Sequence, residues 1–121
     1  MKCVIGIDGG GTKTLLRITD LEGRVLTEQT GGLSNICASD RKTVEDNLRD
    51  LLNRSLKELP SNREIAAVCI GSAGVVAKEN VLFFKEFLKE MTECGNVIVY
   101  TDAYVALFAN LESKPGVSVT A

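Results

Sequence analysis

Three consecutive glycines, Gly9 to Gly11, separate two short β-rich runs near the amino terminus of the chain. The first run covers Lys2 to Ile7 and the second covers Leu15 to Thr19, and a gap this short favours an antiparallel hairpin. Glycine tolerates positive φ and carries no side chain, so an anion can approach its backbone N–H groups closely. The glycines therefore constrain both the local fold and the chemistry of the turn.

Two other phosphate-binding patterns fail at this stretch. The P-loop requires a Gly-Lys pair after four free positions, but Gly11, which stands five residues after Gly6, is followed by Thr12. The dinucleotide fingerprint requires a glycine that opens a helix, but its last place, counted from Gly9, is Thr14, and a strand-like run follows. A glycine hairpin between two strands is the pattern that remains.

This hairpin carries its own set of candidate ligands. Backbone N–H groups, two hydroxyls and one cation can face a phosphate, and these candidates are Gly9, Gly10, Gly11, Thr12, Lys13 and Thr14. Asp8, at the end of the first strand, could hold Mg²⁺ through water, because this cation dehydrates reluctantly. The alternative is a hairpin with a solvated Thr-Lys tip and no ligand. The aspartate on one side and Thr-x-Thr on the other favour phosphate.

Hydrophobic patterning orders the rest of the chain. Apolar residues at spacings of three and four indicate helices, and short continuous apolar runs indicate covered strands. The expected elements are a strand at Arg24–Thr30, a helix from Asp40 to Leu56, a strand at Ile65–Ile70, a helix from Val81 to Met91, a strand at Val97–Tyr100, a short helix at Ala103–Leu111 and the start of a strand at Val117–Ala121. The order predicts an α/β fold, in which a mixed five-stranded sheet of three antiparallel strands and two βα units has helices on both faces.

Length, charge and composition exclude several classes of partner. A chain of 121 residues is expected to form one domain. A net charge of −2 and only 5% aromatic residues argue against nucleic-acid binding and against an anionic membrane surface. The first apolar run is too short for a signal peptide, and no stretch approaches the roughly 18 apolar residues of a membrane span. A cytoplasmic location is the expectation.

The chain contains four cysteines, far apart in sequence, and no histidine. This excludes a Cys/His zinc site and histidine-based nucleophilic catalysis, so acid–base chemistry falls to a carboxylate, a lysine or a tyrosine. Cys3 and Cys69 lie inside apolar runs, so we expect them to be small buried residues in a reducing compartment.

The stretch Gly6-Ile-Asp-Gly-Gly-Gly-Thr-Lys-Thr14 resembles the first phosphate motif of the actin, hexokinase and heat-shock-chaperone superfamily of ATPases. Within it, the chain is similar to the branch that contains N-acetylglucosamine kinases and the ATPase activators of 2-hydroxyacyl-CoA dehydratases. The resemblance covers essentially the whole chain, because the expected order of elements is that of the amino-terminal ribonuclease-H-like lobe. It implies ATP and Mg²⁺ as cofactors and an ATP-dependent kinase for N-acetylglucosamine or a related amino sugar.

The resemblance also assigns roles to three other stretches. Asn35, with Ser34, matches the place where kinases of this branch hold the amino sugar, although a turn without a ligand would choose the same residues. Asp102, in the stretch Val99–Ala103, matches the catalytic base of sugar kinases, and it could also cap the next helix. Ser72 belongs to a Gly-Ser-Ala-Gly loop whose counterpart lines the cleft, either as a donor to substrate or as a small residue that allows close approach.

Residues 1–121 are therefore expected to form a single amino-terminal actin-like ATPase lobe without the carboxyl-terminal lobe, which in the superfamily supplies a second phosphate hairpin and the adenosine pocket. We expect this chain alone to have little or no kinase activity, because one phosphate site cannot close around Mg-ATP. Its last residues would fray, pack on an edge or pair with another copy in a homodimer. A dehydratase activator and a nucleotide-binding module without turnover remain open, as do the sugar and the phosphorylated hydroxyl.

Overall fold

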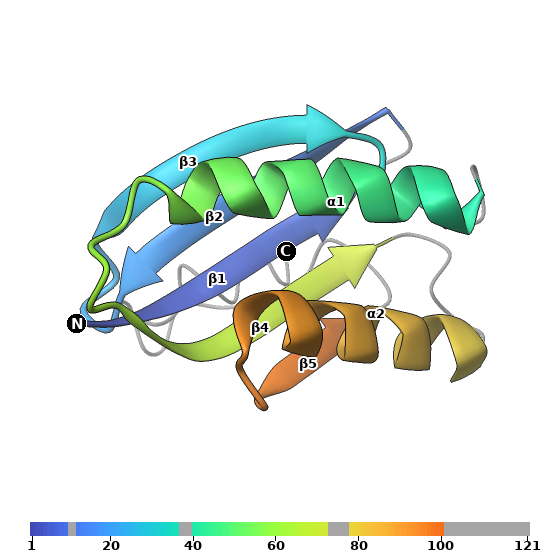
Figure 1. The fold of residues 1–121 in the computed structure, drawn as a ribbon. Helices are drawn as coiled ribbons and strands as arrows, with labels where there is room; N and C mark the ends of the chain where they lie inside the picture. The colour runs from blue at the N-terminus through green and yellow to red at the C-terminus, as the bar shows by residue number, and fades with distance from the viewer. Residues whose placement is uncertain (10–11, 37–39, 73–77, 101–121) are drawn as a thin grey trace, which may run out of the picture.

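The computed structural model describes residues 1–9, 12–36, 40–72 and 78–100, which form a five-stranded sheet and two helices (Figure 1). The elements are β1 (Lys2–Gly9), β2 (Lys13–Asp20), β3 (Val25–Gly32), α1 (Arg41–Leu56), β4 (Glu64–Ser72), α2 (Lys78–Thr92) and β5 (Val97–Tyr100). The strand order is β3-β2-β1-β4-β5, with β1 antiparallel to β2 and parallel to β4. The predicted α/β class and the mixed sheet of three antiparallel strands and two parallel additions are confirmed.

The central strand, β1, explains why its sequence is almost continuously apolar. It pairs with β2 on one side and with β4 on the other, so its backbone is hydrogen-bonded along both edges. Cys3, Ile5 and Ile7 are fully buried beneath the helices, and Val4, on the opposite face, is only 5% exposed. A strand covered on both faces selects an apolar run rather than an alternating pattern.

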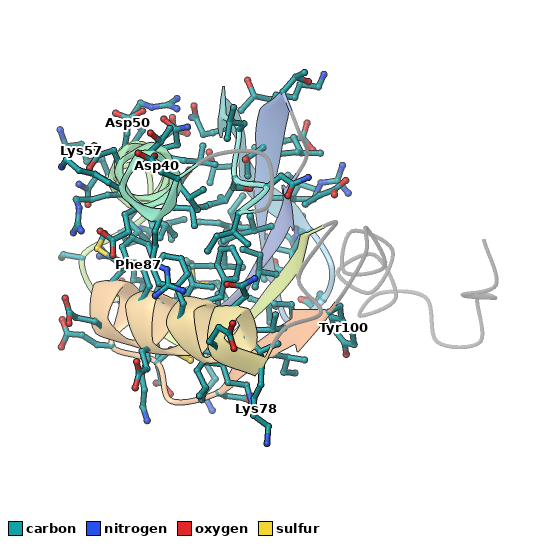
Figure 2. The ribbon with its side chains drawn as sticks, turned by 90° about the vertical axis from the view of Figure 1, so that its right-hand side faces the viewer. Asp40, Asp50, Lys57, Lys78, Phe87 and Tyr100 are labelled. Atoms are coloured by element: carbon teal, nitrogen blue, oxygen red, sulfur yellow. The ribbon has the colours of Figure 1, made fainter. Side chains whose placement is uncertain are left out.

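The two helices α1 and α2 lie side by side on one face of the sheet (Figures 1 and 2). Leu48 of α1 and Phe84 of α2 are fully buried in the core between the helices and the strands. Phe87 lies between the helices, and the guanidinium carbon of Arg49 stands 5.3 Å from the centre of its ring (Figure 2). The sequence predicted helices on both faces, but the third expected helix, at 103–111, lies outside the described residues, as does the expected strand at 117–121.

Helix α1 begins at a residue that the sequence supports as a cap. The Asp40 side chain accepts a hydrogen bond from the Thr43 backbone N–H at 2.9 Å, which satisfies one of the free donors of the first turn. Hydrogen bonding from Thr43 lowers the pKa of the Asp40 carboxyl. This cap sets the residue at which α1 begins.

Strands β1 and β2 extend further toward the glycines than their apolar residues predicted. β1 runs to Gly9 rather than to Ile7, and β2 begins at Lys13 rather than at Leu15. Gly9 pairs with Thr14 across the hairpin. Neighbouring strands hold residues of low β-propensity in the ladder, because packing and pairing outweigh the intrinsic preference. The predicted antiparallel hairpin is confirmed, and its turn is short.

The described cysteines bear out the sequence analysis. Cys3 is 0% exposed and Cys69 is 1% exposed, so both behave as small core residues, and Cys94 is buried as well. Cys37 lies outside the described residues. Within the described part of the chain, neither helix has the length and apolar character needed to cross a membrane.

Candidate functional site

The carboxyl ends of three parallel strands meet at one edge of the sheet. β1 ends at Gly9, which is in register with Ser72 at the end of β4, and one step earlier Asp8 is in register with Gly71. Gly71 is in turn in register with Tyr100, the last residue of β5. The glycine hairpin, the end of β4 and the end of β5 therefore share one edge, where ligands bind in open α/β sheets.

Asp102 itself lies outside the described residues, so its predicted role as catalytic base stays a prediction. The strand that leads to it ends at Tyr100, two positions earlier, and Figure 2 shows Tyr100 at the end of β5. β5 thus ends at the same sheet edge that carries the hairpin.

The described part of the glycine hairpin offers polar groups to solvent. Thr12 and Lys13 are exposed, so a hydroxyl and an ammonium can reach an anion at the turn. Gly9 is buried within the sheet, where its backbone pairs with β2 and β4. Gly10 and Gly11 lie outside the described residues, and their predicted contact with phosphate remains a prediction. The short turn and its exposed cation suit a phosphate ligand.

Asp8 is the carboxylate closest to the glycine turn in sequence. It is the second-last residue of β1 and is partly buried. Burial raises the pKa of the Asp8 carboxyl above its ordinary value of 3.8, and no cation in the described part of the chain offsets this effect. Those residues also contain no cluster of three or more acidic or sulfur ligands. Mg²⁺ is commonly held by one or two carboxylates together with waters and phosphate oxygens, and Asp8 is the candidate carboxylate at this edge.

Thr14 is fully buried, as are Leu16 and Ile18, the next two residues on the same face of β2. Its hydroxyl oxygen is 2.7 Å from the Gly32 carbonyl oxygen and 2.7 Å from the Ser34 hydroxyl oxygen. A hydroxyl has one proton and two acceptor lone pairs, so Thr14 can donate to Gly32 and accept from Ser34 at the same time. In this arrangement Thr14 connects the glycine hairpin to the chain that leaves β3.

The predicted amino-sugar residues follow β3 directly. Ser34 is 0% exposed and its hydroxyl contacts Thr14, so this geometry supports a role in holding the loop. Asn35 is partly exposed, as a residue that contacts a sugar must be. Its predicted role stays a prediction, as does that of Ser72, whose backbone ends β4. The hairpin and the loop with Asn35 are joined by the Thr14–Ser34 contact.

Two residues of α1 that the sequence did not single out hold the end of β3 and the residue that follows it. Asn47 donates its side-chain N–H to the Leu33 carbonyl at 2.8 Å, and Arg54 donates to the Thr30 carbonyl at 2.9 Å. Both belong to the polar residues of an amphipathic helix, which the sequence alone assigns to solvent. The available signal was the Gly31-Gly32 pair at the end of β3, because adjacent glycines often mark a close approach of another element.

Replacing Thr14 by valine is expected to destabilise the chain by about 1–3 kcal/mol, because the Gly32 carbonyl and the buried Ser34 hydroxyl lose a partner. Urea denaturation of Thr14→Val and of the unmodified chain measures the difference. The same change at the exposed Thr12 is the control and is expected to stay within about 0.5 kcal/mol. Equal costs at the two positions would show that the buried contacts contribute nothing.

Two curated proteins are similar to this chain in amino-acid sequence. The chain is 38% identical over 120 residues to an N-acetylmuramic acid/N-acetylglucosamine kinase of Clostridium acetobutylicum, and this match covers 98% of the chain and 39% of the relative. An N-acetyl-D-glucosamine kinase of Dictyostelium discoideum is 30% identical over 123 residues, with 91% of the chain and 37% of that protein covered. The chain thus spans about two fifths of the length of these curated relatives.

The solved structures agree with the sequence matches. The crystal structure of a proposed N-acetylglucosamine kinase from Porphyromonas gingivalis matches this chain with a TM-score of 0.66 and 26% sequence identity. The match covers 83% of this chain and 34% of the Porphyromonas gingivalis chain. The family model described as the BadF/BadG/BcrA/BcrD ATPase family matches residues 5–121, which include the hairpin and all the strands from Ile5 onward. The chain therefore belongs to the BadF/BadG/BcrA/BcrD ATPase family.

Proposed function

We propose that this chain is the amino-terminal lobe of an ATP-dependent kinase that phosphorylates N-acetylglucosamine or a related N-acetylated amino sugar. The observation that carries the proposal is the shared sheet edge, where the glycine hairpin, Asp8 and the end of β5 before Asp102 meet. The names of two relatives, both kinases of N-acetylated amino sugars, support the substrate class. The remaining lobe would complete the ATP site, and the complete enzyme would act in the cytoplasm.

The hairpin would bind the phosphates of ATP. Backbone N–H groups of the turn between β1 and β2, together with the exposed Thr12 and Lys13, would contact the phosphate oxygens. Asp8 would hold Mg²⁺ through water, and the bound ion would supply positive charge near the transferred phosphoryl group. Because phosphoryl transfer has a loose transition state, the protein mainly has to position these groups and stabilise charge.

The sugar would lie between the hairpin and the loop after β3. Asn35 would contact a hydroxyl or the N-acetyl group and so orient the sugar, while Asp102 would accept the proton of the attacking hydroxyl. A carboxylate of ordinary basicity is sufficient for this step, because the proton leaves late in a loose transition state. Thr14 and Ser34 would keep the sugar loop at a fixed place relative to the phosphate hairpin.

A panel of sugars incubated with ATP and a complete protein that contains this lobe tests the proposal. We expect phosphate transfer to N-acetylated amino sugars, and little or no transfer by residues 1–121 alone, because one hairpin cannot enclose Mg-ATP. ATP hydrolysis without any phosphorylated sugar would contradict the kinase assignment and would favour an ATPase that drives another process. Absence of both nucleotide hydrolysis and transfer would favour a binding module.

A further inference from the structure

The end of β3 and the residue that follows it are held by side chains from two other elements. Three backbone carbonyls accept hydrogen bonds from these side chains, two at the end of β3 and one at Leu33, just after the strand. The contacts are those of Arg54 with the Thr30 carbonyl at 2.9 Å, Thr14 with the Gly32 carbonyl at 2.7 Å and Asn47 with the Leu33 carbonyl at 2.8 Å. Thr30 and Gly32 also belong to the ladder of β3 with β2, whereas Leu33 follows that ladder, so the side-chain donor matters most at Leu33.

Gly32 is the residue that lets Asn47 come this close. A Cβ atom built on Gly32 would lie 2.7 Å from the Nδ2 atom, 2.8 Å from the Cγ atom and 2.9 Å from the Oδ1 atom of Asn47. Such distances are shorter than any ordinary carbon contact, so an alanine at position 32 would force the Asn47 amide to move. Moving that amide breaks its hydrogen bond with the Leu33 carbonyl.

The opposite side of the same segment is held by β2. The Ser34 hydroxyl contacts the Thr14 hydroxyl at 2.7 Å, and both side chains are fully buried. Thr14 is paired with Gly9 across the hairpin. Leu33 is therefore fixed from α1 and Ser34 is fixed from β2, and Asn35 is the next residue in the chain.

We infer that Asn47 is a positioning residue for the amino-sugar site, with Gly32 as the glycine that makes room for it. The inference rests on the proposed kinase function, because the sugar is what Asn35 would contact. The side-chain hydrogen bond of Asn47 goes to the protein backbone. It acts through the Leu33 carbonyl and sets where the segment 33–36 lies relative to the phosphate hairpin.

Three variants of the complete protein test this role by kinetics: Asn47→Ala, Gly32→Ala and the double variant. Each is expected to raise KM for the sugar by roughly three- to tenfold, the worth of one hydrogen bond, with KM for ATP unchanged. Because Gly32→Ala acts by displacing Asn47, the double variant should be no worse than either single variant. Asn53→Ala, an exposed asparagine on the same helix, is the matched control and should leave both KM values unchanged.

We call the hydrogen bond between Asn47 and the Leu33 carbonyl the tether. Amide hydrogen exchange on residues 1–121 tests it without any reference to activity. Exchange at 33–36 should become faster in Asn47→Ala and Gly32→Ala, while Asn53→Ala and the amides of β1 stay as in the unmodified chain. This readout remains valid if no sugar is phosphorylated, so failure of the kinase proposal and failure of the tether are distinguishable.

Unchanged exchange at 33–36 in both single variants would overturn the tether. Faster exchange with an unchanged KM for the sugar in an active enzyme would overturn the positioning role. Additive losses in the double variant would also count against it, because two residues acting through one contact cannot each lose that contact independently. Loss of exchange protection throughout the chain would mean that the substitutions unfold the lobe, and would likewise reject a local effect.

Discussion

Replacing Asp102 by asparagine in the complete protein is expected to lower kcat for sugar phosphorylation by about 10²–10⁴-fold, with little change in KM for ATP. Asparagine keeps the size of the side chain but cannot accept the proton of the sugar hydroxyl. The strand β5 directs the chain toward Asp102 from the edge that carries the hairpin, so this carboxylate is the one expected to face the sugar.

Steady-state kinetics of Asp102→Asn and of Asp46→Asn measure this effect. Asp46 is an exposed carboxylate on α1, 3.6 Å from the Lys42 ammonium, and its loss should leave kcat within a factor of about two, as expected of a surface ion pair. A kcat for Asp102→Asn near that of the unmodified enzyme would remove Asp102 from the mechanism. An equal loss in both variants would point to a general effect of charge.

Replacing Asp8 by asparagine is expected to weaken activity by about 10- to 100-fold, with a rise in the Mg²⁺ concentration needed for half-maximal rate. The same substitution is expected to make the lobe more stable at pH 7 in the absence of Mg²⁺. These opposite effects arise because the site keeps a desolvated carboxylate that the fold alone does not need. Kinetics at varied Mg²⁺ measures the first effect, and thermal unfolding with a chelator measures the second.

The pH dependence of the stability gain follows from the direction of the Asp8 pKa shift. Burial raises the pKa of Asp8 in the folded chain above 3.8, so the folded state holds this proton more tightly than the unfolded state does. The carboxylate therefore lowers stability as pH rises through the folded pKa, and it costs nothing below the unfolded pKa. The gain in Asp8→Asn should therefore be larger at neutral pH than at acidic pH, and should vanish below pH 3.8. A gain that is independent of pH would contradict burial as its cause.

Local sequence patterns predicted the fold because the spacing of apolar residues within each element indicates whether it is a strand or a helix. The buried run at Lys2–Ile7 and the spacing of Leu48, Leu51 and Leu52 mark β1 and α1 without reference to the rest of the chain. The order of such elements then leaves few arrangements of the sheet, because short connections pair neighbouring strands. The extra strand length at Gly9 could not be predicted, since it depends on the partner strands and not on glycine itself.

The candidate site could be predicted only for residues that lie next to the glycine motif in the sequence. Asp8 and Lys13 flank glycines, so their place at the hairpin follows from the sequence. The inward orientation of Thr14 and the contact of Asn47 with Leu33 depend on packing of the end of β3 and the residues after it against β2 and α1, through contacts between residues 14 to 20 positions apart. The sequence does not show which polar residue of a helix faces a backbone carbonyl. Nor does Gly32 by itself indicate that the side chain packed against it is Asn47.

The most direct measurement is a crystal structure of the complete protein with N-acetylglucosamine and a non-hydrolysable ATP analogue. We predict that the terminal phosphate lies within hydrogen-bond distance of backbone N–H groups of the turn between β1 and β2, and that the sugar lies between Asn35 and Asp102 with one hydroxyl facing both that carboxylate and the phosphate. A nucleotide whose phosphates lie away from the hairpin, or an Asp102 carboxylate on a different edge of the sheet from Gly9, would contradict the account.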